Sequence, residues 1–152
     1  MKRIMLVAAF AVTLFSVTSA HAQVNVNVNI GTQPVWGPTG YDHVDYYYIP
    51  DAGAYYSVAK KQYVYRENNK WVFRKNLPEQ YKDFDVYKNY KVVINEKSPW
   101  MHDEENRRKY ESFKNRHDQE VIRDSHDSKY FVNKKHPEHD KWVREQKDHG
   151  HH

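Results

Sequence analysis

The chain has 152 residues, of which 29% are charged. It contains no cysteine, which excludes disulfide bonds and cysteine chemistry. One small domain is the natural number for this length. Of the 24 basic side chains, Lys2 and Arg3 lie in a segment that we expect to be removed, so 22 basic side chains remain against 20 acidic ones, a net charge of about +2. Nucleic-acid binding usually needs clustered positive charge, which this balance does not indicate.

The first 22 residues have the layout of a secretory signal peptide. Positive charge at Lys2 and Arg3 precedes an apolar run at 4–15, and Ala20-His21-Ala22 places small residues at both recognition positions of a cleavage site. The run is shorter than the about 20 residues that a membrane-spanning helix needs. An N-terminal anchor or a buried helix is the alternative. We expect cleavage after Ala22 and an exported protein, periplasmic or extracellular, without a transmembrane anchor.

Residues 23–40 read as a strand and an irregular link. Apolar residues alternate with asparagine from Val24 to Ile30, which predicts a half-buried strand with the asparagines on its other face. The same pattern also suits a strand that docks onto the sheet edge of a partner, or self-association through 24–30. Proline and glycine are dense from Gln33 to Gly40, which is typical of a link between elements.

Residues 41–94 are predicted to form a small β-rich domain. Four short aromatic strands are expected near 44–49, 54–58, 62–66 and 70–74. Turn-forming residues at 50–53 and 67–69 separate them, and 59–61 supply the middle loop. A short helix over 77–89, with proline in its first turn, and a further strand at 91–94 complete this part.

The expected loops also predict a register. Ile49 facing Ala54 pairs Tyr48 with Tyr55, a three-residue middle loop then pairs Tyr55 with Tyr65, and Arg66 facing Lys70 pairs Tyr65 with Trp71. One face of the meander would carry an aromatic row, which is the candidate ligand-binding site: Tyr48, Tyr55, Tyr65 and Trp71. Such a row either packs as core or, if left open, stacks on sugar rings or grips an extended peptide.

Residues 95–152 differ in composition from what precedes them. They hold 13 basic and 13 acidic side chains and 8 of the 10 histidines, with few large apolar residues. This composition predicts a charged, partly helical or disordered region, with a polar helix over 103–116 that carries Tyr110 and Phe113 as its apolar stripe. The fold class is therefore mainly β: a small antiparallel Tyr-rich meander with one or two short helices and a loosely ordered charged C-terminal region.

Several runs together resemble a group of small exported proteins of Gram-negative envelopes. They are the Val-Asn repeat ending in Ile-Gly, Pro-Val-Trp-Gly-Pro, Tyr-Tyr-Tyr-Ile-Pro-Asp-Ala-Gly-Ala-Tyr-Tyr, Gln-Tyr-Val-Tyr, Lys-Trp-Val-Phe and Leu-Pro-Glu-Gln-Tyr. The resemblance covers about residues 23–135 and extends to a His-rich end. It implies an envelope location and the Tyr-rich sheet, and it carries no activity or site residues.

Catalysis is not indicated. Ser125-His126-Asp127 has the letters of a catalytic triad, but neighbours in sequence cannot form the line of nucleophile, base and orienting group. The chain has no Gly-x-Ser-x-Gly elbow and no Gly-rich phosphate loop. We therefore expect a protein that is not an enzyme and that binds a peptide, a glycan or another envelope protein, or has a structural role.

The C-terminal histidines are the candidate metal ligands: His136, His139, His149, His151 and His152. Imidazole beside carboxylate suits zinc, nickel or copper, and His136 and His139 are spaced to share one side of a helical turn. Pro137 disturbs that turn, and a solvated, charge-balanced tail explains the composition equally. No cofactor is expected beyond weak binding of these metals. The alternative function is thus periplasmic metal binding or buffering through this tail.

Overall fold

The computed structural model describes residues 28–149. The predicted signal peptide and most of the alternating segment lie outside the described residues. The described end of that segment is not a strand, because Ile30 begins a 3-10 helix that ends at Thr32. Asn29 does not face solvent as the alternation predicts. Its side chain donates to the carbonyl of Val44 at 2.7 Å and accepts from the amide of the same residue at 2.9 Å.

The core of the fold is one five-stranded antiparallel sheet with the order β4-β3-β2-β1-β5, which confirms the mainly β class. The five strands are β1 (Tyr46–Ile49), β2 (Ala54–Ser57), β3 (Gln62–Glu67), β4 (Lys70–Arg74) and β5 (Val92–Ile94). Each predicted strand of the meander is present. The first hairpin has the expected register, with Tyr48 opposite Tyr55.

The next two registers differ from the prediction by one residue each. Tyr55 lies opposite Val64, because the middle loop holds four residues and the amide of Lys61 donates to the carbonyl of Ser57. Arg66, instead of Tyr65, lies opposite Trp71. Because side chains alternate along a strand, the first slip moves Tyr65 to the opposite face and the second returns Trp71 to the face of Tyr55.

Both faces of the sheet are covered by apolar side chains. On the first face, the buried residues Tyr48, Tyr55, Val64 and Ile94 form one cluster, against which Trp100 and Tyr110 pack from the segment that follows β5. On the second face, Val44, Tyr47 and Val58 form another cluster with Trp36 and Tyr56 beside it. Aromatic packing on two faces therefore takes the place of a large aliphatic core.

The remaining elements are short helices. They are the 3-10 helices η1 (Ile30–Thr32), η2 (Glu79–Tyr81), η3 (Pro99–His102), η4 (Glu111–Phe113), η5 (Ile122–Asp124) and η6 (Ser128–Tyr130), and the α-helices α1 (Asp103–Lys109) and α2 (His139–His149). In the part of the chain that the structure describes, none has the length and apolarity needed to cross a bilayer.

Two predicted helices are shorter than expected. Over 77–89 only η2 forms, since the carboxylate of Asp85 accepts the amide of Tyr87 at 3.0 Å and offers the backbone a local turn in place of a helix. The helix predicted over 103–116 ends as α1 at Lys109, and η4 follows it. Tyr110 nevertheless packs on the sheet as its expected apolar position requires.

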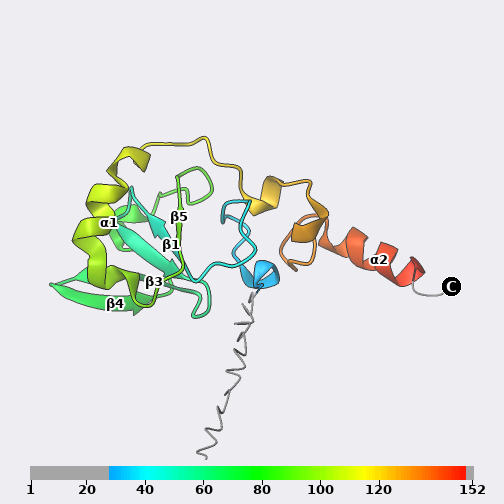
Figure 1. The fold of residues 1–152 in the computed structure, drawn as a ribbon, viewed down its shortest axis with the longest axis horizontal. Helices are drawn as coiled ribbons and strands as arrows, with labels where there is room; N and C mark the ends of the chain where they lie inside the picture. Colours follow the sequence, from blue (N-terminus) through cyan, green and yellow to red (C-terminus); the bar gives the residue numbers. More distant parts are fainter. Residues whose placement is uncertain (1–27, 150–152) are drawn as a thin grey trace, which may run out of the picture.

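The C-terminal region packs against the segment that precedes β1. Ile30, Val35, Ile122 and Tyr130 are buried together in a third cluster. The amide of Gly40 donates to the Tyr130 hydroxyl at 2.6 Å. Figure 1 shows this contact region between the sheet and α2, with β4 at the opposite end of the molecule from α2. Residues that are about ninety positions apart in the sequence thus share one core.

Candidate functional site: a groove beside the free sheet edge

The predicted aromatic row is not an open face. Tyr48, Tyr55 and Tyr65 are buried, and Trp71 alone is partly exposed. Tyr48, Tyr55 and Trp71 share one face, whereas the register shift places Tyr65 on the other. The row that sequence reasoning offered to a ligand is therefore divided between two faces, and most of it packs as core.

A polar network holds α1 over the first face of the sheet. The Tyr55 hydroxyl donates to the carboxylate of Asp103 at 2.9 Å and accepts from Asn106 Nδ2 at 3.1 Å. Arg107 Nε donates to the same carboxylate at 2.7 Å, and Arg107 Nη2 donates to the carbonyl of Gly53 at 3.0 Å. The network joins the start of β2 to α1 and fixes the helix relative to the sheet.

Burial changes the pKa of the groups in this network and of Tyr48, whose ring packs beside Tyr55. Burial raises the pKa of Tyr48 to about 12, and it raises the pKa of Tyr55 well above the usual range. For Arg107, burial is the largest single influence and opposes the charge, but the hydrogen bond to Asp103 and the charge of that carboxylate together outweigh it and raise the pKa. The two tyrosines are thus neutral and the arginine is charged at physiological pH. Tyr55 and Arg107 hold α1 on the sheet through their hydrogen bonds to Asp103.

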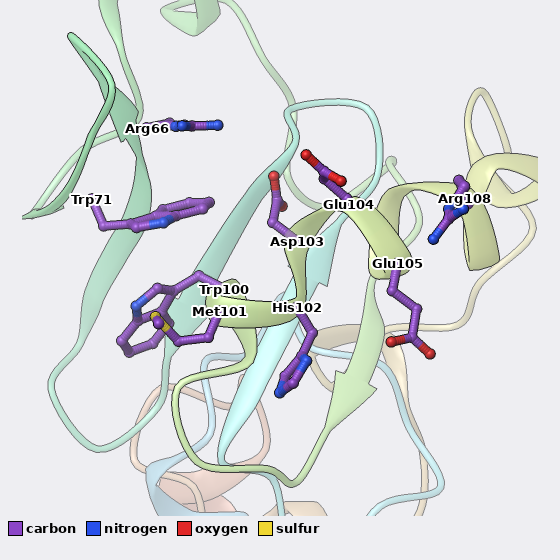
Figure 2. Close-up of a pocket in the computed structure, with 9 residues that line it drawn as sticks. All are labelled: Arg66, Trp71, Trp100, Met101, His102, Asp103, Glu104, Glu105 and Arg108. Carbon is purple, nitrogen blue, oxygen red and sulfur yellow. The ribbon is translucent and has the colours of Figure 1, made fainter.

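A groove of about 360 Å³ opens between this helix and the end of the sheet. Trp71 and Arg66 line it from the sheet, and Trp100 and Met101 line it from η3. Figure 2 shows Arg66 lying over the Trp71 indole, with Trp100 and Met101 on the other side of that ring. Trp100 is held edge-on by Phe73 at 5.3 Å between ring centroids, and the side chain of Met101 is 72% exposed.

Acidic and basic side chains line the rest of the groove. Glu104, Glu105 and Arg108 extend from α1, which begins at its rim. In Figure 2, His102 points away from Trp71 and Arg66. The groove therefore combines half-exposed aromatic rings, an exposed thioether and charges of both signs, which suits recognition of a mixed polar and apolar ligand.

The strand beside this groove has a free edge. β4 pairs with β3, and within residues 28–149 no other backbone segment bonds to it. The opposite edge, β5, is shorter and is partly closed. The side chain of Gln119 accepts the amide of Lys91 and donates to its carbonyl, both at 2.9 Å, where the next strand would bond.

The histidines proposed as metal ligands do not come together in the described part of the chain. His136 is buried, its Nδ1 accepts the amide of Glu138 at 3.1 Å, and its Nε2 bonds to the carbonyl of Ser125 at 3.2 Å. His139 Nδ1 bonds to the carbonyl of Phe131 at 2.7 Å, and His149 ends α2. No group of three possible ligands occurs among residues 28–149. His151 and His152 lie outside the described residues.

The triad-like run at 125–127 has a local structural role. The Ser125 hydroxyl accepts the amide of Asp127 at 3.2 Å, and the carboxylate of Asp127 accepts the amide of Lys129 at 3.0 Å to cap η6. His126 is exposed. These hydrogen bonds turn the chain toward the buried Tyr130.

Comparison of the chain with protein-family models, with curated proteins and with solved structures gave no match. Function is therefore inferred from the groove and the free edge.

Sequence reasoning found Trp71 but missed the rest of the groove. Arg66 is predicted to be the last residue of a strand, next to a turn, and nothing in that position indicates a binding surface. Trp100 and Met101 come well after β4 in the chain, so their meeting with Trp71 could not be foreseen. The one available signal was the apolar pair Trp100-Met101, which is separated by His102 from the acidic start of a polar helix. An apolar pair at the end of a helix indicates a contact or a binding surface but does not name its partner.

Proposed function

We propose that this protein is an exported, non-enzymatic envelope protein that binds an extended peptide along β4. The observation that carries the proposal is that β4 is an edge strand with a free outer side, next to the groove of Trp71 and Trp100. A peptide that adds as a further strand gains backbone hydrogen bonds from the edge. Alternate side chains of that peptide then enter pockets on one face.

The side chains of β4 favour this use of the edge. Trp71, Val72 and Phe73 are partly exposed at its centre, and Lys70 and Arg74 are exposed at its ends. Exposed apolar edges invite pairing, while charged ends limit indiscriminate aggregation. A matching peptide has apolar residues at alternate positions. The sequence at 24–28 of a second copy has that pattern, whereas Asn29 and Ile30 are held within the fold, so self-association through 24–28 is part of the proposal.

The sequence of the N-terminal segment supports the exported part of this proposal. The proposal rests on the charged start, short apolar run and small-residue cleavage site of residues 1–22, and on the resemblance to small exported envelope proteins. Metal buffering receives no support from the contacts of His136, since both of its ring nitrogens are used within the fold.

The test measures binding of a fluorescently labelled peptide with the sequence of residues 23–30. The fluorescence anisotropy of the peptide reports the binding. Edge addition predicts saturable binding that disappears when alternate peptide nitrogens are methylated, because methylation removes their hydrogen-bond donors. Trp71→Ala should weaken binding by about tenfold, as expected for an aromatic residue at the centre of an interface.

Trp142→Ala is the matched control, since Trp142 is also partly exposed but lies on α2. It should leave peptide binding unchanged. Equal binding of the methylated and unmethylated peptides would contradict edge addition. Equal weakening by the two tryptophan substitutions would show that the groove is not the site.

A further inference from the structure

Another cavity, of about 470 Å³, lies where three segments that are distant in the sequence meet. Lys61 reaches it from the loop between β2 and β3, and Lys134 and Lys135 reach it from the segment before α2. Residues 31–34 form a third side. We call this cavity the lysine pocket.

The charge around the lysine pocket is of one sign. No acidic side chain lines it. Within residues 28–149, none of its three lysines lies in an ion pair, whereas nearby Lys129 is paired with Asp42 at 3.2 Å. The groove beside β4 and the cavity near Arg123 both mix acidic with basic side chains. The lysine pocket thus carries three positive charges that the described structure leaves uncompensated.

The wall of the lysine pocket is apolar and held in place. The Tyr56 ring stands edge-on to Trp36 at 4.8 Å and to Tyr63 at 5.0 Å between centroids, which fixes its position. Pro34 and Val132 add aliphatic surface, and Val132 is 44% exposed. An exposed apolar wall beside lysines suits a ligand that is itself amphipathic.

The polar floor of the pocket is already satisfied. Asn133 Nδ2 donates to the carbonyl of Gln33 at 2.7 Å, and Asn133 Oδ1 accepts the amide of Lys135 at 3.1 Å. Gln33 Nε2 donates to the carbonyl of Tyr41 at 3.1 Å, and Gln33 Oε1 accepts the Tyr47 hydroxyl at 3.1 Å. The floor is therefore rigid, and the lysines supply the donors that are left for a ligand.

We propose that the lysine pocket binds a phosphate group carried on an apolar body. A phosphate offers several acceptor oxygens and up to two negative charges, which matches three lysines that line one cavity without a carboxylate. The apolar body would lie against Tyr56, Pro34 and Val132. A phospholipid headgroup and a small amphipathic phosphate ester share this chemistry.

The experiment is calorimetric titration of the protein with octyl phosphate at low ionic strength. The test variant is Lys61→Gln with Lys134→Gln and Lys135→Gln. The control variant is Lys82→Gln with Lys97→Gln and Lys147→Gln, which removes the same charge from exposed lysines outside the pocket. The proposal expects one-to-one binding that the test variant weakens by at least about tenfold and the control by less than about twofold. Circular dichroism establishes that both variants are folded.

Inorganic phosphate and lipid vesicles complete the test. Inorganic phosphate should bind more weakly than octyl phosphate, since it leaves the apolar wall uncovered. Binding to phosphatidylglycerol vesicles, absent with phosphatidylcholine and lost in the test variant, would support a phospholipid source. Binding of octyl phosphate without vesicle binding would support a small molecule. Absence of octyl phosphate binding at millimolar concentration, equal loss in both variants, or equal affinity for inorganic phosphate would overturn the proposal.

Discussion

Two neighbouring tyrosines on the first face of the sheet differ in what their hydroxyl groups meet. Tyr48 and Tyr55 face each other across β1 and β2, with ring centroids 4.9 Å apart, and both are buried. The Tyr55 hydroxyl has Asp103 and Asn106 as partners. Among the described residues, the buried Tyr48 hydroxyl has none. Burying an unpaired hydroxyl costs free energy, whereas a paired one stabilises the fold.

Replacement of each tyrosine by phenylalanine should therefore have different effects. Tyr55→Phe leaves Asp103 and Asn106 without a buried partner, and we expect it to lower the free energy of unfolding by about 1–3 kcal/mol. Tyr48→Phe removes only the unpaired hydroxyl, and the free energy of unfolding should stay the same or rise. Urea denaturation followed by tryptophan fluorescence measures both. Equal destabilisation by the two substitutions would mean that the Asp103 network does not hold α1 on the sheet.

At the scale of elements, the turn between β3 and β4 decides which residues share a face. Glu67 pairs with Lys70, so the turn holds two residues, Asn68 and Asn69, with φ of +48° and +60°. Positive φ at both central positions is the geometry of a tight hairpin turn that matches the twist of its strands. Asparagine tolerates this conformation better than other residues with a Cβ.

Substitution at Asn69 tests this turn. Asn69→Ala should lower the free energy of unfolding by about 1–2 kcal/mol, because the Cβ of alanine lies too close to the following carbonyl oxygen in the left-handed region. Asn69→Gly should leave stability unchanged or raise it, since glycine adopts positive φ without a clash. Asn76→Ala, in an exposed loop with no positive φ, is the control and should have little effect. A thermal denaturation series in which Asn69→Ala matches the Asn76→Ala control would rule out strain at this position.

The strands could be predicted from the sequence, and their registers could not. Alternating aromatic residues between turn-forming residues located β1 to β4 to within about two residues, as expected for boundaries. The length of each loop sets the register, and composition does not reveal that length. Three residues were expected in each of two loops, but the loop ending at Lys61 has four and the turn at Asn68 has two. One residue of error moved Tyr65 to the other face.

The two proposed binding surfaces could not be predicted from the sequence either, for a different reason. The groove joins Trp71 with Trp100, and the lysine pocket joins Lys61 with Lys134 and Lys135. These residues are distant in the chain and meet only through tertiary packing. The composition of residues 95–152 predicted loose order, and it gave no sign that Ile122 and Tyr130 complete a core with Ile30 and Val35. These few apolar residues hold the C-terminal region against the segment that precedes β1.

At the scale of the whole molecule, the buried titratable groups act in opposite directions on stability at alkaline pH. Lys91 is almost fully buried, its Nζ donates to the carbonyl of Val86 at 3.0 Å, and burial lowers its pKa from 10.5 to about 8. Burial raises the pKa of Tyr48 and Tyr63 from 10.0 to about 12. Stability rises with pH wherever the unfolded chain binds more protons than the native one, and falls where it binds fewer.

The free energy of unfolding should therefore rise and then fall above neutral pH. Above about pH 8 the native chain has released the Lys91 proton while the unfolded chain keeps it up to about pH 10.5, so stability increases. Above about pH 10 the unfolded chain loses tyrosine protons that native Tyr48 and Tyr63 keep up to about pH 12, so stability decreases. Urea denaturation between pH 7.5 and about pH 11 should show this maximum. Lys91→Met should remove the rise and retain the fall, while Tyr63→Phe should reduce the fall and retain the rise. A rise of the same slope in Lys91→Met would assign it to another group, and it would mean that Lys91 keeps its proton in the folded protein.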